Sequence, residues 1–425
     1  MKIDQVSSLR GSLTVPGDKS ISHRSVMFGA LSEGLTEVHH FLPSADCLST
    51  IDCMRKLGIH IENKDNVLLI HGNGLHGLAA PKETLDAGNS GTTTRLLSGI
   101  LAGQNFRSRI DGDASLTSRP MKRIMDPLTQ MGGSIISENN NGCAPLIIEG
   151  KPLHGITYHT PVASAQVKSC IILAGLYAEG ETRVIEPSLS RDHTERMLRT
   201  FGADLFTAED GAICLIPGNK LEGQKIDVPG DISSAAYFLA ASLLVPNSEI
   251  RLNNVGLNPS RDGLIRVIEA MGGHLEYENK TTGDGEPSAD IIVHTTHLHG
   301  TEISGSIIPT LIDEIPIIAV MAAFAEGETV IRDAAELKVK ETDRLALITE
   351  NLTRMGADIT ATDDGMIIRG GKPLHGAEIE VLGDHRMAMA FSIAGLMTGG
   401  VEIPDSKCVA VSYPDFYETL KTLSR

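Results

Sequence analysis

An internal repeat constrains the fold of this chain more than any other feature of its sequence. The tetrapeptide Val15–Asp18 recurs as Val228–Asp231, 213 residues later in a chain of 425 residues. An offset of about half the chain indicates two similar halves. Because the matching segments stand between the halves, we expect the chain to cross between two domains at both places. We also expect a cleft to close about them.

A shorter period, of about 70 residues, divides each half into three. One marker is a glycine that ends a helical pattern before a strand-like one, at Gly58, Gly132, Gly202, Gly272 and Gly356. A second marker is a Leu-His-Gly or Leu-Glu-Gly tripeptide that ends at Gly77, Gly155, Gly223, Gly300 and Gly376. A third is a polar or small residue that opens an apolar helix, at Asp18, Gly91, Ser164, Asp231, Asp313 and Asp384. Chance recurrence of turn glycines is the alternative, but three markers in phase favour six α+β units, three in each half.

Helical and strand-like patterns alternate within these units, so the sequence predicts a mixed α and β fold. The spacing predicts a helix over Thr342–Met355 and a strand over Ala377–Leu382. Another helix is predicted to run to about Leu31, with Asp18 or Ser20 as its N-cap.

Composition limits the classes of protein to which the chain can belong. Apolar residues make up 41% and charged residues 21%, which excludes a mainly disordered chain. The net charge of −17 opposes binding to nucleic acid or anionic lipid, so an anionic ligand needs a local basic cluster. The apolar runs fall short of the roughly 18 residues that a membrane span requires. The six cysteines include no C-x-x-C pair, and we expect free thiols in a cytoplasmic protein.

Positive charge collects at the predicted helix openings. Free N–H groups and the helix dipole make such openings anion sites. The basic segments are Asp18–Arg24, Asn89–Arg95, Ser118–Arg123, Lys338–Arg344 and Gly383–Arg386. A capped helix or a solvated salt-bridge face explains any one of them, and Pro120 near the first position of a helix does so for the third. Several segments in phase with a repeat favour anion binding.

Other polar groups stand among these cations. Asp313 precedes an apolar run, where partial desolvation would raise its pKa and favour the character of a base. An ordinary N-cap explains Asp313 equally well. Ser164 and Gln166 supply neutral donors at another helix opening, and a capping hydroxyl with an exposed amide is the alternative there.

Motifs for nucleotide, metal and acyl-transfer chemistry are missing from the sequence. There is no G-x-x-x-x-G-K-[ST] and no G-x-S-x-G, and the glycine-rich piece 283–285 lacks the strand and helix of a dinucleotide site. The fifteen histidines include no H-E-x-x-H or comparable ligand cluster. We therefore predict no cofactor and no structural or catalytic metal.

Five motifs together resemble one enzyme family, the 3-phosphoshikimate 1-carboxyvinyltransferases, or EPSP synthases. The motifs are Gly17–Arg24, Gly88–Thr92, Ser118–Met121, Lys340–Arg344 and Gly383–Met389. The resemblance implies two domains, each of three βαβαββ units in an inverse α/β barrel, that close over a central cleft. Residues 1–17 with 230–425 would form one domain, and residues 18–229 the other.

The resemblance implies that the enolpyruvyl group of phosphoenolpyruvate moves to the 5-hydroxyl of shikimate 3-phosphate and that phosphate leaves, in the chorismate route to aromatic amino acids. Both substrates are small anions, in agreement with the local basic clusters. A monomer is the family default.

The resemblance also assigns residues to each substrate. Shikimate 3-phosphate would contact Lys19, Ser20, Arg24, Ser164, Ala165, Gln166, Asp313 and Lys340. Phosphoenolpyruvate would contact Lys19, Gly91, Arg119, Gln166, Arg344 and Arg386. The addition passes through a tetrahedral ketal phosphate, so one group must protonate the methylene carbon and another must take the 5-hydroxyl proton. Asp313 is the candidate base, Glu341 the candidate donor to carbon, and Lys19 would assist at the phosphate or the hydroxyl.

Three positions depart from the family pattern. Ala165 stands where many members have a Ser for the substrate phosphate, Glu336 where many have Asn, and Val411 where many have a Lys that contacts phosphoenolpyruvate. The segments Ser164–Gln166 and Asn258–Arg261 are similar to the subgroup that tolerates the inhibitor glyphosate, which predicts tolerance here.

Two other functions are alternatives. UDP-N-acetylglucosamine enolpyruvyl transferases resemble this chain in fold and donor, but they carry a Cys five residues before the Arg of an Arg-Pro motif, where this chain has Ala114. A protein that senses phosphorylated metabolites without turnover needs the cations, but it has little use for carboxylates beside anions. A purely structural repeat gives no reason to collect charge at helix openings.

Overall fold

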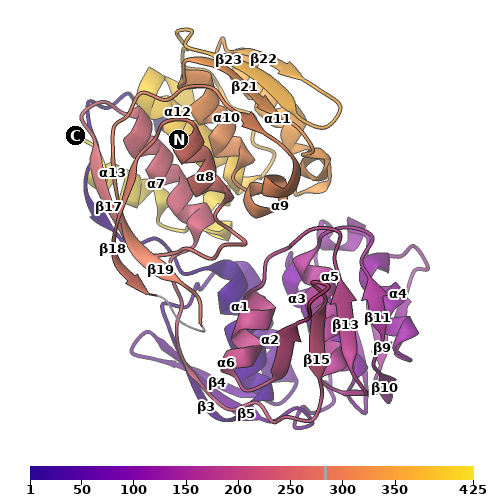
Figure 1. Cartoon of the computed structure of the whole chain (residues 1–425). Helices are drawn as coiled ribbons and strands as arrows, with labels where there is room; N and C mark the ends of the chain where they lie inside the picture. The colour runs from indigo at the N-terminus through magenta and orange to yellow at the C-terminus, as the bar shows by residue number, and fades with distance from the viewer. Residues whose placement is uncertain (282–284) are drawn as a thin grey trace. The chain divides into compact units, whose positions relative to one another are not determined.

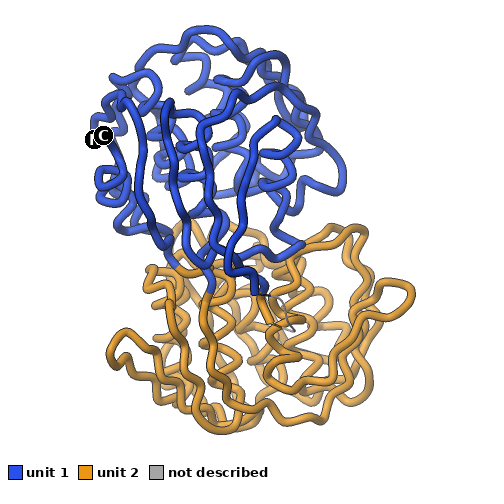
Figure 2. The backbone as a smooth tube through the Cα atoms, turned by 60° about the vertical axis from the view of Figure 1, so that its left-hand side comes forward, with its two compact units in different colours: residues 1–16, 229–282, 287–425 blue, residues 17–228, 283–286 orange. Residues whose placement is uncertain are grey.

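The computed structural model describes residues 1–281 and 285–425, so most of the glycine-rich piece 283–285 lies outside the described residues. The chain forms two compact units, which Figure 2 shows in separate colours. Unit 1 comprises Met1–Pro16, Pro229–Thr282 and Pro287–Arg425, and unit 2 comprises Gly17–Val228 and Gly283–Glu286. Each unit has its own hydrophobic core. Both long crossings fall inside a Val-Pro-Gly-Asp segment, one residue before the predicted boundaries.

Unit 2 contains three four-stranded sheets with one shared topology, in which an edge strand is parallel to its neighbour and the other pairs are antiparallel. The sheets, in spatial order, are β16 (Lys225–Asp227), β3 (Glu33–His39), β5 (Val67–Asn73) and β4 (His60–Lys64); β6 (Leu85–Asp86), β7 (Arg107–Asp111), β9 (Leu146–Glu149) and β8 (Ser134–Ser137); and β11 (Thr157–His159), β13 (Thr182–Ile185), β15 (Ile213–Ile216) and β14 (Asp204–Thr207). A parallel pair is formed by β10 (Leu153–His154) and β12 (Ala178–Glu179). The helices are α1 (Lys19–Leu31), α2 (Ala45–Lys56), α3 (Gly91–Ala102), η1 (Leu116–Ser118), α4 (Lys122–Gln130), α5 (Ala165–Gly175) and α6 (His193–Thr200).

Unit 1 repeats this plan, with sheets on either side of its central helices (Figure 1). Two four-stranded sheets consist of β18 (Leu275–Thr281), β19 (Ser288–His294), β17 (Glu249–Gly256) and β2 (Arg10–Leu13), and of β20 (Glu302–Ile303), β21 (Gly327–Ile331), β23 (Met366–Gly370) and β22 (Asp358–Ala361). A short pair is formed by β1 (Lys2–Ile3) and β24 (Val401–Glu402). The helices are α7 (Ile232–Leu244), α8 (Gly263–Ala270), η2 (Gly305–Ile307), α9 (Ile308–Leu311), α10 (Ile315–Phe324), η3 (Ala335–Val339), α11 (Arg344–Arg354), α12 (His385–Thr398), η4 (Ser406–Val411) and α13 (Phe416–Leu423).

The predicted βαβαββ order holds in five of the six units of the described chain, with one edge strand exchanged between the halves. The sixth unit differs, because α12 is followed only by β24, η4 and α13. Strand β2 precedes the first crossing and pairs in unit 1 with β17. Strand β16 precedes the second crossing and pairs in unit 2 with β3. All the described sheets are open, so the predicted inverse barrel consists of separate sheets around inner helices.

The helices that open each βαβαββ unit form the inside of the fold. Every residue of α7 is buried, and α10 and α12 contact it and each other. An apolar surface all round is typical of a core helix. In unit 2, Gly99 of α3 permits a close approach to α5, since a Cβ there would lie 2.2 Å from the Cys170 carbonyl oxygen.

The glycines that mark the period end the outer helices, as predicted. Their φ angles are 90°, 92°, 100°, 84° and 89° at Gly58, Gly132, Gly202, Gly272 and Gly356. This left-handed conformation closes a helix and costs glycine little. A strand follows each of them.

The strand predicted over Ala377–Leu382 is wrong. Only Glu378 bridges β24, which is two residues long and offers a short partner. The side chain of Asn351 takes both backbone groups of Glu380, accepting from its N–H at 2.9 Å and donating to its carbonyl at 2.8 Å. A side chain has therefore replaced the next rung of the ladder.

The other local predictions fared better. The predicted helices appear as α11 and as α1 with Asp18 as N-cap, and the prediction of free cysteines is confirmed. Pro120 differs, because it precedes the N-cap of α4 and bridges Cys143. No single described helix has the length and apolar composition of a membrane span. Among the described helices, one pair reaches that length and composition together, Gly305–Leu311 with Ile315–Phe324, and it is bent by 110° at the break between them.

Candidate active site

The six inner helices begin at the predicted openings. Five carry a side-chain cap, formed by Asp18, Ser90, Ser164, Asp231 and Asp384. Helix α10 differs, because its N-cap is Glu314 and no side chain caps it. The sequence left open whether Asp313 is an ordinary N-cap. The structure shows that it is not, and that its carboxylate has other partners.

Two arginines approach Gly91 at the start of α3. A Cβ atom at Gly91 would lie 2.9 Å from Arg95 Nη1 and 3.6 Å from Arg119 Nη1. Arg119 donates to the carbonyl and side-chain oxygens of Asn89 at 3.3 and 2.6 Å, and Arg95 donates to Gln166 Oε1 at 2.5 Å. The structure thus brings together Gly91, Arg119 and Gln166, which the family resemblance assigned to phosphoenolpyruvate. We name this group, with Arg95, the Gly91 cluster.

Arg95 was not among the predicted site residues. Its signal was present, because it lies four residues after Gly91, and side chains four apart share one face of a helix. The sequence did not show that this face meets Gln166.

The first turns of α1 hold the other predicted residues of this region. Lys19 Nζ lies 2.8 Å from Asp46. Arg24 is 2% exposed, and its guanidinium donates to the Ser20 carbonyl at 3.0 Å and to hydroxyls of α5 and α6 at 2.9 and 2.7 Å. Burial lowers the pKa of Arg24 to about 10, so it stays charged at neutral pH. Arg24 thus links α1, α5 and α6 through hydrogen bonds.

A buried ion network on α5 has no counterpart in the sequence analysis. Lys168 Nζ lies 2.6 Å from Glu195 and 2.8 Å from Glu186. Burial opposes the charge of Lys168, but the two carboxylates raise its pKa. Glu186 also accepts from the amides of Ser164 and Ser190, at 3.2 and 3.4 Å. The network therefore holds the chain around Ser190 against the start of α5.

Asp313 lies between α9 and α10 and faces three cations of unit 1. Its carboxylate oxygens lie 3.5 Å from Lys340 Nζ, 3.4 Å from Arg344 Nη1 and 3.9 Å from Arg386 Nη2. We name these four residues, with Glu341, the Asp313 cluster. Opposite charges at such distances favour the ionised carboxylate, against the desolvation that the sequence emphasised. An ionised carboxylate is the form that can accept a proton.

Arg344 connects Glu341 of this cluster with Asp384, which caps α12. It is fully buried, and it donates to Asp384 Oδ2 at 2.8 Å and to Glu341 Oε2 at 2.6 Å. Burial opposes ionisation of Glu341, but Arg344 and His385 bring its pKa well below the usual range. The side chain of Glu341 is 38% exposed. Glu341 is thus an accessible anion at neutral pH.

A second buried network explains Arg261 of the Asn258–Arg261 segment. Its guanidinium donates to Asp231 at 3.1 Å and to the Ser233 hydroxyl at 2.6 Å. That hydroxyl donates to Glu314, the N-cap of α10. Arg261 therefore links the starts of α7 and α10, which is a structural role.

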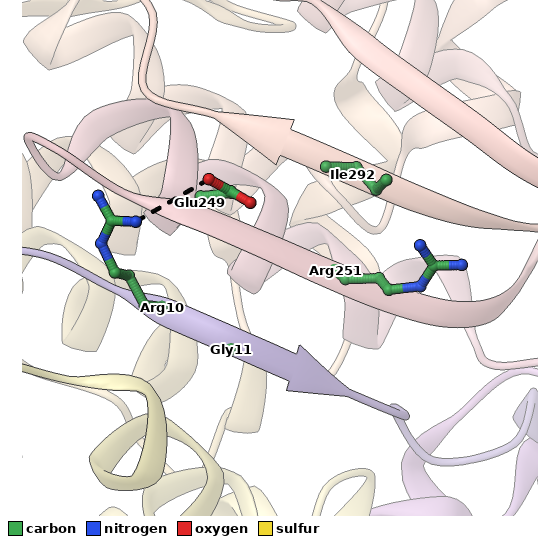
Figure 3. Close-up of a pocket in the computed structure, with 5 residues that line it drawn as sticks. All are labelled: Arg10, Gly11, Glu249, Arg251 and Ile292. Atoms are coloured by element: carbon green, nitrogen blue, oxygen red, sulfur yellow. Dashed lines mark ion pairs between the residues drawn. The ribbon is translucent and has the colours of Figure 1, made fainter.

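A hollow of about 270 Å³ on the outer sheet of unit 1 contains no predicted site residue. Figure 3 shows it across β2, β17 and β19, where Arg10 pairs with Glu249 at 3.9 Å. Arg251 beside it is already paired with Glu278 at 2.6 Å. The residues that line this hollow lie on strands, and none of them belongs to a helix opening that carries cations.

The three departures from the family pattern lie in helical elements. Ala165 is the first residue of α5, Glu336 lies in η3, and Val411 ends η4. Valine at 411 adds no charge to the three cations around Asp313.

Comparisons with known proteins agree with this chemistry. The family model described as EPSP synthase (3-phosphoshikimate 1-carboxyvinyltransferase) matches residues 3–420. Proteins named 3-phosphoshikimate 1-carboxyvinyltransferase from Brevibacillus brevis and Bacillus subtilis are 53% and 52% identical, each over 427 residues, with full coverage of both chains.

Solved structures give the same result. An EPSP synthase from Acinetobacter baumannii is 47% identical, has a TM-score of 0.91 and covers 100% of this chain and 97% of its own. The enolpyruvyl transferase NikO from Streptomyces tendae has a TM-score of 0.81 at 18% identity, covers 99% of this chain and 96% of its own, and shows the fold alone. With a family match over nearly all its length and relatives more than half identical, this chain belongs to the EPSP synthase family of enolpyruvyl transferases.

Proposed function

We propose that the chain transfers the enolpyruvyl group of phosphoenolpyruvate to the 5-hydroxyl of shikimate 3-phosphate and releases phosphate. One observation carries the proposal: in the Asp313 cluster, a carboxylate faces three cations at 3.4 to 3.9 Å, and a second carboxylate bonds one of them. The cations suit anionic substrates, and the two acids suit proton transfer. The names of the relatives support the same reaction.

The binding roles follow the charges. Phosphoenolpyruvate is held by Lys19, Gly91, Arg119, Gln166, Arg344 and Arg386. Shikimate 3-phosphate is held by Lys19, Ser20, Arg24, Ser164, Ala165, Gln166, Asp313 and Lys340. Guanidinium forks match carboxylate and phosphate, and glycine at position 91 leaves room beside two of them. Residues 18–229 and residues 230–425 with 1–17 act as the two halves of the enzyme.

Two proton transfers accompany the addition. Asp313 takes the proton of the 5-hydroxyl while the hydroxyl oxygen bonds to C2 of phosphoenolpyruvate. Glu341 gives a proton to the methylene carbon. The C–O bond to phosphate then breaks, phosphate leaves with the bonding electrons, and the Glu341 carboxylate takes back one methyl proton, which restores the double bond. Glu341 has a lowered pKa in the free protein, and it gains its proton when substrate anions neutralise Arg344. Lys19, paired with Asp46 at 2.8 Å, assists at the phosphate.

A metabolite sensor without turnover is the second candidate. It requires the arginines of the Gly91 cluster, but it gives Asp313 and Glu341 no task. We further propose that the protein acts as a cytoplasmic monomer without cofactor or catalytic metal. Sedimentation at micromolar concentration tests the monomer.

The first experiment mixes the purified protein with both substrates, omits each in turn, and follows phosphate release and product mass together. We expect phosphate release that requires both substrates and a product heavier than shikimate 3-phosphate by one carboxyvinyl group. UDP-N-acetylglucosamine serves as the competing acceptor, and turnover with the sugar nucleotide alone would refute the proposal. Binding of both substrates without phosphate release would favour the sensor.

A second experiment tests the roles. Glu341→Gln should lower kcat strongly and leave the affinity for shikimate 3-phosphate near that of the parent, because the amide keeps the shape but holds no transferable proton. Glu418→Gln, which changes an exposed carboxylate of α13, is the matched control. Equal losses in both variants would contradict the role of Glu341.

A further inference from the structure

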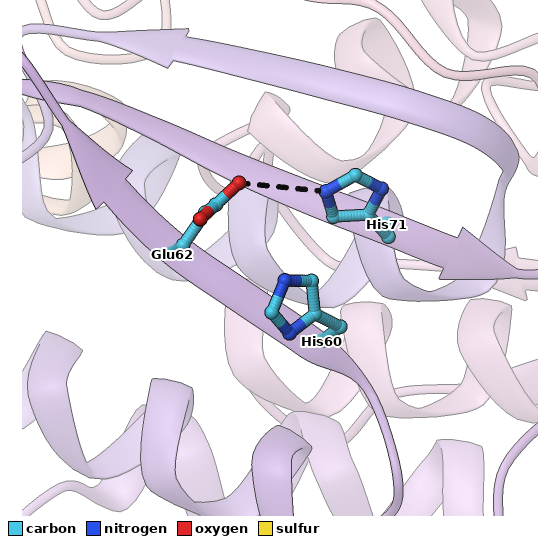
Figure 4. Close-up of side chains that lie close together, drawn as sticks. All are labelled: His60, Glu62 and His71. Carbon is cyan, nitrogen blue, oxygen red and sulfur yellow. Dashed lines mark ion pairs between the residues drawn. The ribbon is translucent and has the colours of Figure 1, made fainter.

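Three side chains of one hairpin in unit 2 lie close together and take no part in the chemistry above. One imidazole nitrogen of His60, one of His71 and one carboxylate oxygen of Glu62 lie within 4.8 Å of one another. His71 Nε2 is 3.9 Å from Glu62 Oε1, and the two imidazole centroids are 5.0 Å apart. Figure 4 shows His60 and Glu62 on β4 and His71 on β5, with all three side chains on one face. We name these residues the hairpin cluster.

The turn of the hairpin sets this arrangement. Asp65 and Asn66 form a two-residue loop and both have positive φ, 52° and 63°, as in a type I′ turn. Such a loop fixes the register of the strands, and here it places His60 directly opposite His71. Glu62 is two residues from His60, so it projects from the same face. The local fold therefore presents two imidazoles and a carboxylate together.

This donor set suits a transition metal. Imidazole nitrogen and carboxylate oxygen are the ligands of Zn²⁺, and imidazole also suits Ni²⁺ and Cu²⁺. Bonds of about 2.0–2.1 Å place the ligand atoms of a tetrahedral ion about 3.3 Å apart. All three side chains are exposed, so small rotations close the remaining gap. The net charge of −17 also favours cations.

We propose that the hairpin cluster is a surface site for one divalent transition metal ion, Zn²⁺, Ni²⁺ or Cu²⁺, with water completing the coordination. Mg²⁺ and Ca²⁺ are poor occupants, because they prefer oxygen ligands. The site uses no residue of the Gly91 or Asp313 clusters. It is therefore independent of the proposed transfer reaction. It departs from the prediction of no metal, because the sequence did not show that His60 lies opposite His71.

Equilibrium dialysis of the metal-stripped full chain against Zn²⁺ tests the site. We expect the parent protein to bind one Zn²⁺ ion. In His60→Gln and in His71→Gln the affinity for this ion should fall on the order of tenfold or more. Glu62→Gln should show a smaller loss. The matched control is His297→Gln, because His297 is an exposed histidine outside the cluster. Identical Zn²⁺ curves for the parent, His60→Gln and His71→Gln would overturn the proposal.

Electron paramagnetic resonance of the Cu²⁺ form gives a second readout. We expect nitrogen hyperfine splitting from two imidazoles in the parent protein and from fewer in either histidine variant. A spectrum that neither substitution changes would refute the site. Transferase activity equal to that of the parent, measured without metal, verifies that both variants are folded.

Discussion

The Gly91 cluster of unit 2 and the Asp313 cluster of unit 1 hold cations in opposite ways. Arg119 donates to neutral oxygens, those of Asn89 and the Ser115 hydroxyl. Arg344 and Arg386 instead lie beside carboxylates, Asp313 among them. An anion can thus approach Arg119 without displacing a negative group, whereas the unit 1 arginines already share their charge with acids.

The difference indicates a division of labour. A guanidinium on neutral partners keeps its full attraction for a phosphate or carboxylate. Cations mixed with acids weaken each other as anchors, but they hold carboxylates in defined protonation states, which acid–base chemistry needs. We therefore assign mainly binding to the Gly91 cluster and proton transfer to the Asp313 cluster.

The largest expected effect tests the proton-transfer side. Asp313→Asn keeps the shape of the side chain but removes the base, so kcat should fall by about 10²- to 10⁴-fold. Steady-state kinetics at saturating substrates measures it, with the exposed turn residue Asp363→Asn as control. A kcat within threefold of the parent would remove Asp313 from the mechanism.

The next largest effect concerns the buried ion network of unit 2, in which one cation faces two carboxylates. Lys168→Met leaves Glu186 and Glu195 buried without their cation, which should cost about 3–5 kcal/mol of folding free energy. Urea denaturation measures the loss. Adding Glu195→Gln should recover part of it, and an unchanged midpoint would show that the ion network does not stabilise the unit.

A smaller effect tests the binding side. In Gly91→Ala the new Cβ would lie 2.9 Å from Arg95 Nη1, so the guanidinium must move. If the Arg95 guanidinium moves, it loses its charge-assisted hydrogen bond to Gln166. This loss should raise KM for phosphoenolpyruvate on the order of tenfold and change kcat less. In an Arg95→Ala background the same substitution should cost less, because the contact is gone. An equal rise in KM in both backgrounds would show that the contact with Arg95 does not matter for binding, which would contradict the binding role of the Gly91 cluster.

The smallest effect concerns a buried base of unit 2 that stays neutral. Burial lowers the pKa of His23 to about 3, and its Nδ1 lies 2.7 Å from the Thr50 hydroxyl. Below pH 6.5 the unfolded chain gains a proton there and the folded chain does not, so acid destabilises the fold. This loss is about 1.4 kcal/mol between pH 7.5 and 5.5.

His23→Gln should lack this component of the pH dependence. Its stability relative to the parent should therefore rise as the pH falls, which urea midpoints at the two pH values can check. Parallel pH dependences in the two proteins would show that His23 titrates in the folded state.

Much of the fold could be predicted from the sequence because its signals are local. A glycine such as Gly58 ends a helix through its own φ angle, and Asp18 caps the helix that it precedes. The strand over Ala377–Leu382 failed because Asn351, a residue of α11, takes the backbone groups of Glu380. Nothing near the predicted strand in sequence reveals that competitor.

The candidate site divides along the same line. The sequence by itself determined the helix openings, the cations they carry and the family, since these depend on residue types at fixed short spacings. Only the tertiary structure decided that Asp313 faces three cations, that Lys168 holds Glu186 and Glu195, and that His60 meets His71. Burial and charge pairing depend on which distant segments pack together, and a charged side chain takes its chemical character from the neighbours that packing supplies.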